Sequence, residues 1–467
     1  MIKPDSNEVL IRLEEDLGLF NATINGIRFW ERLRLPVFFA ILEHVRIKAE
    51  TLSLRKRRLK RYLISIFKLH RNAILSPKNQ ILFVCSGRKV LEKDNLWWDI
   101  YTDPIIAALD SPPLVIEPHY KENHYKPAKT PGIRYLDFID FLTFIRRTLR
   151  LSRITFTKKE SLLLQKIRKE IFSKFEVDID IESLTRRILT DRKSRLPLFR
   201  WMLRRIQPKV VVLAQGYLWE DLVEACKSLG IRSVELQHGA ITPLHLGYSF
   251  EGEFRTKETF ADYLLAWGDY WRTCVEYPIP KEKVVSIGFP YFEIKKDSYS
   301  TITRRRQILF ISQDTVGKTL SKIAVELSKA DDLGYDILYK LHPAEQRGWR
   351  EQYPWLAMSK IQVVAKQDAD LYELFAESLI QVGVYSTALF EGLAFGLQTY
   401  VIDAPGIEHA RPLLETGMVQ KASNVEELMQ HIKDAKGSEA TDLEHFFKSN
   451  SSQNAASFFR ELLQNEK

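Results

Sequence analysis

A short apolar run that ends in three hydroxyl side chains constrains the fold of this chain more than any other feature. Residues 379–384 read LIQVGV, and Tyr385, Ser386 and Thr387 follow directly. The run is long enough for a buried β-strand, and Ser386 is a preferred residue at the start of a helix. Apolar residues then recur at helical spacing from residue 388 onward. The segment therefore predicts a strand, a polar turn and a helix, the repeating unit of an α/β fold.

The start of this predicted helix is suited to a phosphate group. The first N–H groups of a helix lack partners and carry the positive end of its dipole, so a diphosphate can rest on Ser386 and Thr387. Glu391 follows about one turn later, where a carboxylate can accept the two hydroxyls of a ribose. The alternative interpretation is that Ser386 only caps the helix and that Glu391 is a solvent-exposed residue.

A second strand-like run, residues 336–341, ends in His342 and Pro343. Open parallel sheets bind ligands outside the carboxyl ends of their strands, so His342 and Ser386 are expected to face the same crevice from different strands. A His-Pro pair alone is often a structural turn. Its combination with the Ser-Thr helix start favours a site for a phosphorylated ligand.

Length and charge bound the class of protein. The 467 residues, of which 45% are hydrophobic, exceed one ordinary domain and can supply two cores. The net charge of +9 favours an anionic partner: nucleic acid, an anionic membrane surface or a phosphorylated substrate. Three widely separated cysteines predict neither a disulfide framework nor a zinc site. The chain has no signal-like start and no apolar run of about 18 residues, so we expect a cytoplasmic protein.

The sequence divides into four expected segments. Residues 1–75 have helical spacing, and the stretch 55–71 sets Lys and Arg beside apolar side chains. Such a stretch can bind the inner face of an anionic membrane peripherally, or it can dock on its own domain. Residues 76–298 and 299–440 each alternate strand-like and helical runs, which predicts two Rossmann-like domains with parallel sheets. Residues 441–467 are expected to form a C-terminal helix.

The first of these domains has its own candidate site. A strand-like run ends directly in Gln237, His238 and Gly239. An imidazole at a strand end is suited to act as a general base near neutral pH, so we predict His238 as the base. Glu220 and Asp221, at the start of a preceding helix, are the alternative bases, or they only complement the helix dipole.

An aromatic and acidic stretch in the same domain is the candidate acceptor site. Trp97, Trp98 and Asp99 are consecutive, and aromatic rings stack on the faces of sugars. The other interpretation, equally weighted, is that the two tryptophans are core or loop anchors.

The order of these motifs resembles GT-B glycosyltransferases of the capsule and lipopolysaccharide type. Over residues 205–420 the chain carries Gln-His-Gly after a strand, then Lys-Leu-His-Pro, then Tyr-Ser-Thr-x-x-x-Glu-Gly-x-x-x-Gly. These motifs are similar to those of bacterial Kdo and sialic acid transferases and of CDP-glycerol glycerophosphotransferases, which use cytidine-nucleotide donors. The teichoic-acid-type enzymes have Trp-His-Gly-Thr-Pro, whereas Gln237 replaces the tryptophan here and Ala240 and Ile241 precede Thr242.

The resemblance implies a fold and a set of contacts. The fold is GT-B: α/β, with two Rossmann-like domains facing a cleft, here with an N-terminal helical extension. The loop after the first strand of the second domain would wrap the base or phosphate of the donor. The residues given roles by the resemblance are His238 for catalysis, His342, Ser386 and Thr387 for the donor phosphates, Glu391 for the ribose, and Gln313 and Lys318 from that loop.

The expected activity is transfer of a sugar from a nucleotide-activated donor, a CMP-sugar among the candidates, to a surface polysaccharide or lipid-linked glycan. No Asp-x-Asp motif stands at a suitable strand end, so we expect no metal ion or other cofactor. Inversion and retention of the anomeric centre both stay open. A CDP-polyol phosphotransferase and a sugar-nucleotide 2-epimerase-like enzyme are the alternatives. A nucleic-acid binder is disfavoured, because the basic residues lie on predicted helices without a recognisable binding motif.

Overall fold

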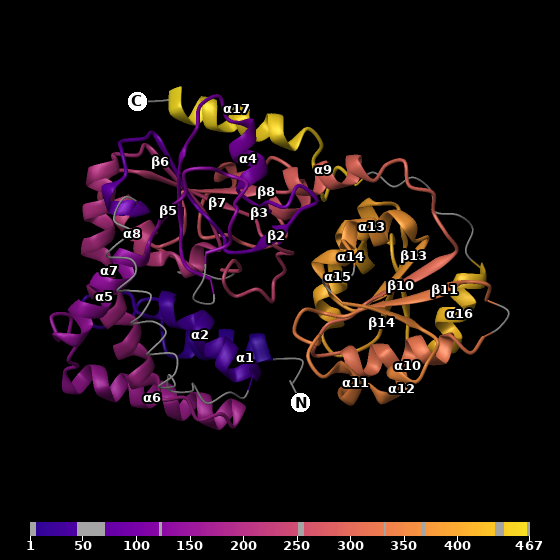
Figure 1. The fold of residues 1–467 in the computed structure, drawn as a ribbon. Helices are drawn as coiled ribbons and strands as arrows, with labels where there is room; N and C mark the ends of the chain where they lie inside the picture. Colours follow the sequence, from indigo (N-terminus) through magenta and orange to yellow (C-terminus); the bar gives the residue numbers. More distant parts are fainter. Residues whose placement is uncertain are drawn as a thin grey trace. The chain divides into compact units, whose positions relative to one another are not determined.

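The computed structural model forms two compact units, each built around one parallel sheet (Figure 1). It describes residues 6–43, 71–120, 124–250, 256–330, 333–365, 369–434 and 443–464. Unit 1 comprises residues 1–290 and 450–467, and unit 2 comprises residues 291–449. The basic stretch 55–71, expected to bind a membrane or its own domain, lies outside the described residues except for Arg71.

Unit 1 contains a sheet of seven parallel strands in the order β5-β4-β1-β6-β7-β8-β9. Every residue of β1, β4 and β6 is buried, which explains why these strands are apolar except for Glu117 at the end of β4, because both faces of such a sheet are covered by helices. The strands are β1 (Ile81–Val84), β4 (Leu114–Glu117), β5 (Arg134–Tyr135), β6 (Val210–Ala214), β7 (Arg232–Leu236), β8 (Tyr263–Ala266) and β9 (Val284–Ser286).

Helices cover both faces of this sheet. On one face, α5 (Asp137–Thr148), α7 (Ile181–Ile206) and α8 (Glu220–Ser228) share a core with Leu82 and Val84 of β1. Phe83 points to the other face, because side chains alternate along a strand, and its ring lies 5.8 Å from Phe459. Phe459 belongs to α17 (Ser451–Gln464), which contacts α4 (Asp103–Ala108). The C-terminal helix therefore covers the sheet of unit 1.

The N-terminal helices belong to unit 1 as well. α1 (Ser6–Asp16) and α2 (Trp30–Glu43) share a second apolar core with α6 (Lys158–Phe175) and the first half of α7. Arg34 of α2 is buried; its Nε donates to Glu14 Oε1 over 2.8 Å, and its Nη1 donates to the carbonyl oxygen of Ser249 over 2.6 Å. These contacts fix the loop that follows β7. In the part of the chain that the structure describes, none of the helices is both long and apolar enough to cross a membrane.

Unit 2 contains six parallel strands in the order β12-β11-β10-β13-β14-β15. The chain starts at the central strand β10, moves outward to β12, and then returns to the other side of β10 with β13. This reversal creates a switch point between β10 and β13, where open α/β sheets bind ligands. The strands are β10 (Gln307–Ile311), β11 (Asp336–Lys340), β12 (Gln362–Val364), β13 (Ile380–Gly383), β14 (Gln398–Ile402) and β15 (Gln420–Ala422).

Short helices connect these strands. One apolar core of unit 2 is formed by residues of β10, β11, β13 and β14 together with two of these helices, α10 (Gly317–Leu327) and α16 (Val425–Asp434). The helices are α9 (Pro290–Ser298), α10 (Gly317–Leu327), α11 (Trp349–Gln352), α12 (Pro354–Ala357), α13 (Leu371–Glu377), α14 (Thr387–Ala394), α15 (Arg411–Glu415) and α16 (Val425–Asp434). The two sheets confirm the fold class predicted from the sequence: α/β and GT-B-like, with two Rossmann-like units and N-terminal helices.

Candidate functional site

The carboxyl edge of the unit 2 sheet gathers the residues that the sequence predicted for donor binding. His342 follows β11 and Ser386 follows β13, and these two strands flank β10 on either side. Because all three strands are parallel, both residues lie at the same edge of the sheet. Gln313 and Lys318 come from the segment after β10, which reaches the same edge.

Ser386 caps α14 as its sequence predicts. Its backbone is extended, at φ −113° and ψ 145°, and its hydroxyl oxygen accepts a hydrogen bond from the N–H of Ala388 over 3.2 Å. Thr387 is the first helical residue. Glu391, one turn further on, is 8% exposed, so the interpretation of Glu391 as a solvent-exposed residue is wrong. A Cβ at Gly392 would overlap the side chain of Gln381 in β13, which explains a glycine where α14 packs on the sheet.

A buried carboxylate organises the loops around His342. Glu345 is 2% exposed and accepts hydrogen bonds from Ser312 Oγ over 2.9 Å, from Tyr353 Oη over 2.7 Å and from the N–H of His342 over 2.7 Å. It therefore ties the loop after β10 to the loop after β11. Sequence reasoning missed Glu345, although a carboxylate three residues after a histidine at a strand end was a usable signal.

The ring of His342 is oriented by its own loop. The N–H of Ala344 donates to His342 Nδ1 over 3.2 Å, so the neutral ring carries its proton on Nε2. An Nε2–H group can donate to an anionic oxygen. The imidazole is half-buried at the sheet edge, which leaves part of the ring accessible to a ligand.

The loop after β10 and the segment after β14 complete this edge. Gln313 is half-buried, and among the described residues its Oε1 has no hydrogen-bond partner, while Lys318 is exposed. Thr315 is hydrogen-bonded to the hydroxyl of Tyr385. The Tyr385 ring lies 5.3 Å from that of His409, whose pKa is lowered by burial. His409 was also missed, because no strand-to-helix pattern marks the turn in which it lies.

Gly317, at the start of α10, gives a first test of this arrangement. A Cβ there would overlap the carboxylate of Glu345 and crowd the Tyr353 hydroxyl. We expect Gly317→Ala to lower the free energy of unfolding of unit 2 by about 1–3 kcal/mol, the usual cost of overpacking a buried site. Urea unfolding measures the change, with Thr319→Ala at an exposed position of the same helix as the control. Equal stability of the two variants would show that the side chains around Glu345 accommodate the added methyl group without loss of stability.

In unit 1, His238 lies after β7 with both ring nitrogens engaged. Tyr217 Oη is 3.1 Å from Nε2, and Tyr248 Oη is 3.1 Å from Nδ1. Burial lowers the pKa of the imidazole to about 3, with smaller contributions in the same direction from His245 and Arg88, so the ring is neutral near pH 7. The backbone oxygen of His238 accepts a hydrogen bond from Tyr101 Oη over 2.5 Å.

Glu220 and Asp221 are held in ion pairs at the start of α8. Glu220 Oε1 lies 2.6 Å from Lys257 Nζ, and Asp221 Oδ1 lies 2.7 Å from Arg32 Nη1. Arg32 also contacts Glu224 over 2.7 Å. Both carboxylates are therefore engaged in ion pairs, and loss of their negative charge would leave buried cations without partners.

The predicted acceptor residues form a small antiparallel hairpin. Trp97, Trp98 and Asp99 make up β3 (Trp97–Asp99), which pairs with β2 (Lys89–Leu91). Asp99 is fully buried and accepts hydrogen bonds from the N–H of Ser86 over 2.7 Å and from Ser86 Oγ over 2.9 Å, so it anchors the loop after β1. The two tryptophans are half-buried, and Lys129 Nζ lies 4.2 Å from the centre of the Trp98 ring.

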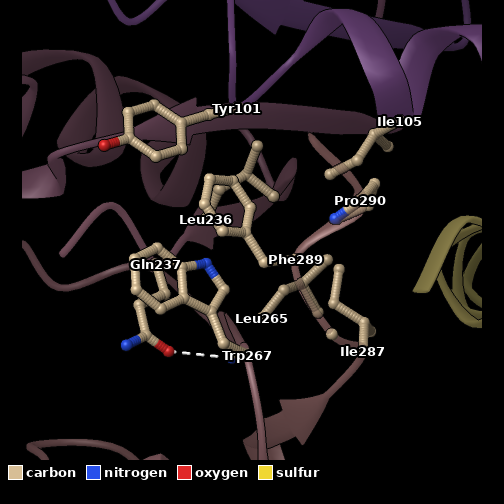
Figure 2. Close-up of a pocket in the computed structure, with 10 residues that line it drawn as sticks. Tyr101, Ile105, Leu236, Gln237, Leu265, Trp267, Ile287, Phe289 and Pro290 are labelled. Carbon is tan, nitrogen blue, oxygen red and sulfur yellow. Dashed lines mark hydrogen bonds between the residues drawn. The ribbon is translucent and has the colours of Figure 1, made fainter. Parts of the chain in front are cut away.

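A small apolar pocket in unit 1 is lined by Gln237, the residue before His238, and by Tyr101, which is hydrogen-bonded to the backbone oxygen of His238. Figure 2 shows this pocket. Its aromatic wall consists of Trp267 and Phe289, stacked with ring centres 4.6 Å apart, and Tyr101, 5.8 Å from Phe289. Gln237 is the polar residue of the lining; its Oε1 accepts the N–H of Trp267 over 2.8 Å. The remaining lining residues are Ile105, Leu236, Leu265, Ile287, Gly288 and Pro290. Sequence reasoning missed this pocket, because its walls come from segments far apart in the chain.

Comparison with known proteins finds solved structures of weak overall similarity and no family match. No family model matches the chain. No curated protein matches it. Solved structures that resemble it include the UDP-GlcNAc 2-epimerase of Methanocaldococcus jannaschii in complex with UDP-GlcNAc and UDP, at 13% identity and a TM-score of 0.47, over 82% of this chain and 99% of that one.

Two further structures show the same level of similarity. A putative UDP-N-acetylglucosamine 2-epimerase of Listeria monocytogenes has 13% identity and a TM-score of 0.48, over 83% of this chain and 96% of that one. The spinosyn rhamnosyltransferase SpnG has 11% identity and a TM-score of 0.41, over 82% and 96%. At such low similarity, the GT-B-like assignment rests on the topology of the two sheets of this chain.

Proposed function

We propose that this chain is a glycosyltransferase that transfers a sugar from a nucleotide-activated donor, with CMP-sugars as the first candidates, to a growing surface polysaccharide or lipid-linked glycan. The observation that carries the proposal is the common position of His342 and the Ser386 helix start at the switch-point edge of the unit 2 sheet. A histidine that donates from Nε2 and a capped helix start together suit a phosphate-bearing ligand.

In this proposal the donor binds to unit 2. His342 Nε2–H and the start of α14, with Ser386 and Thr387, contact the donor phosphates and stabilise the negative charge that develops on the leaving group. Glu391 accepts the ribose hydroxyls. Gln313 and Lys318 contact the base or the phosphates from the loop after β10.

The acceptor binds to unit 1, where His238 takes part in removing the proton of the attacking hydroxyl. The neutral state of the ring supports this assignment. The ion pairs of Glu220 and Asp221 with Lys257 and Arg32 disfavour these carboxylates as the base.

Trp97 and Trp98 bind the acceptor sugar, and Asp99 holds the loop beside them. No metal ion takes part in the reaction. The protein acts at the cytoplasmic face of the membrane, where residues 55–71 contact anionic lipid.

A thermal-shift screen of the full chain against CMP, CDP, UDP, GDP and TDP tests the donor site. A nucleotide that binds only the folded state raises the melting temperature as its concentration increases. At a hundredfold excess over its Kd, the free energy of unfolding rises by about 2.7 kcal/mol. We expect a shift with CMP. A shift with CDP alone would favour the polyol-phosphate transferase, and a shift with UDP, GDP or TDP alone would assign the donor to that nucleotide. No shift with any nucleotide would contradict the donor site.

A further inference from the structure

Four side chains of unit 1 form a continuous hydrogen-bonded chain. Tyr217 Oη lies 3.1 Å from His238 Nε2, His238 Nδ1 lies 3.1 Å from Tyr248 Oη, and Tyr248 is hydrogen-bonded to Glu235 Oε1. The N–H of Gly216 also donates to Glu235 Oε1, over 2.7 Å. Glu235 and Tyr248 are 1% exposed, whereas Tyr217 is only half-buried. The chain therefore runs from a partly accessible phenol to a buried carboxylate.

The donors and acceptors along this chain can be assigned from chemistry. Tyr248 Oη donates to Glu235 Oε1, so the single proton of Tyr248 points to Glu235. Tyr248 Oη must then accept from His238, which places the ring proton on Nδ1. His238 Nε2 is consequently bare and accepts the hydroxyl proton of Tyr217. Every donor points towards Glu235, which is the arrangement that a proton relay requires.

We propose that Glu235 is the final acceptor of the proton released by the acceptor hydroxyl, and that Tyr217, His238 and Tyr248 relay that proton. The proposal rests on the transferase function above and identifies where its proton goes. As the acceptor oxygen bonds to the anomeric carbon, the bond from that carbon to the donor phosphate breaks and its electron pair leaves with the phosphate. The acceptor proton moves to Tyr217, which passes its own proton to His238 Nε2. The Nδ1 proton moves to Tyr248, whose proton moves to Glu235.

The surroundings of Glu235 suit a proton acceptor. Burial raises the pKa of its carboxyl group, while the hydrogen bonds from Tyr248 and Gly216 and the charge of Lys257 oppose this rise. The other titratable groups around it are Tyr217 and Tyr277, both with raised pKa values, and neutral His238. His238 alone would be a weak base, so the relay supplies a more basic end point and leaves the ring neutral before and after transfer.

Glu235→Gln is the first test, because glutamine keeps an oxygen for Gly216 and Tyr248 but cannot take up the proton. With a nucleotide-sugar donor shown to support transfer, we expect kcat to fall about 10²-fold while the KM for the donor stays unchanged. In the unaltered protein, activity should be lost as the pH falls through the raised pKa of Glu235, and this acid limb should be absent in Glu235→Gln. A kcat within twofold of the original, with the acid limb kept, would overturn the relay.

Tyr248→Phe interrupts the relay and leaves both ends in place, so it should lower kcat to a similar extent. Tyr277→Phe is the matched control, because its hydroxyl is bonded to the carbonyl oxygen of Trp271 and its ring lies 6.5 Å from that of Tyr248, outside the relay. We expect kcat of Tyr277→Phe to remain close to that of the unaltered protein. An equal loss in both tyrosine variants would assign the effect to packing and overturn the relay.

Nitrogen NMR of the histidine rings tests the chain without any activity measurement. We expect His238 to carry its proton on Nδ1 in the unaltered protein and to lose this preference in Tyr248→Phe. A proton on Nε2 in the unaltered protein would overturn the relay. The Nδ1 form in a protein that transfers no sugar would instead contradict the proposed function and leave the hydrogen-bonded chain intact.

Discussion

Replacement of His238 by alanine is expected to lower kcat for sugar transfer by about 10²- to 10⁴-fold, the usual contribution of general acid–base catalysis. Donor affinity should not change, because His238 belongs to unit 1 and the proposed donor residues belong to unit 2. Single-turnover kinetics gives the rate, and calorimetric titration with the nucleotide gives the affinity. A variant that loses donor affinity as well would contradict this division of roles.

His342→Ala should have the opposite profile. A hydrogen bond to a charged group contributes about 1.5–3 kcal/mol, so loss of the Nε2–H donor should weaken donor binding by roughly 10- to 100-fold. His431→Ala on α16 is the matched control, because this half-buried histidine of unit 2 belongs to no proposed site. Equal donor affinity in His238→Ala and His342→Ala would disprove both assignments.

Arg34→Ala should cause the largest loss of stability. Arg34 is 1% exposed and Glu14 is 2% exposed, so the substitution leaves a buried carboxylate without its cation. Removal of one partner of a buried ion pair costs about 3–5 kcal/mol. The carbonyl oxygens of Leu246 and Ser249 also lose a donor, which frees the loop that carries Tyr248.

Hydrogen exchange in urea measures this effect in each unit separately. Exchange should accelerate throughout unit 1 and stay unchanged in unit 2. Arg12→Ala is the control, because Arg12 and its partner Glu8 are more than two-thirds exposed, at 73% and 72%, and exposed pairs contribute little. If Arg34→Ala unfolds no more readily than Arg12→Ala, the buried pair does not stabilise unit 1.

Local patterns in the sequence were sufficient for most of the strands and for the positions of His342 and Ser386, the residues proposed to bind the donor. Ser386 and His342 each follow a short apolar run, and a strand end is visible within about ten residues of chain. The parallel order of the strands then brings both residues to one edge. The alternative interpretation of Glu391 as a solvent-exposed residue was wrong, because its side chain is 8% exposed. Residues far along the chain contact α14, among them Phe446, whose ring lies 5.4 Å from that of Phe390.

Contacts between distant segments could not be predicted in the same way. Glu220 and Asp221 look like free carboxylates at a helix start, but the cation of Asp221, Arg32, lies 189 residues before it. In the proposed relay, Tyr217 contacts His238, which lies 21 residues further along the chain. The direction of proton transfer follows from the hydrogen bond between Tyr248 and Glu235, which only the structure shows. The chain has a helix near its C-terminus, α17, and this helix packs against Phe83 of β1. The sequence shows that side chains alternate along a strand, but it does not show which helix covers which face of the sheet.

Because α17 belongs to unit 1 although it follows unit 2 in the chain, unit 2 is an insertion in the sequence of unit 1. During synthesis, the sheet of unit 1 is complete once β9 has emerged, but the contact between Phe83 and Phe459 can form only after all of unit 2 has been made. Unit 1 therefore receives its last helix after its neighbour has been synthesised. A nascent chain arrested before residue 450 lacks this helix, whereas an excised unit 2, whose sheet is contiguous in sequence, should fold without the rest of the chain.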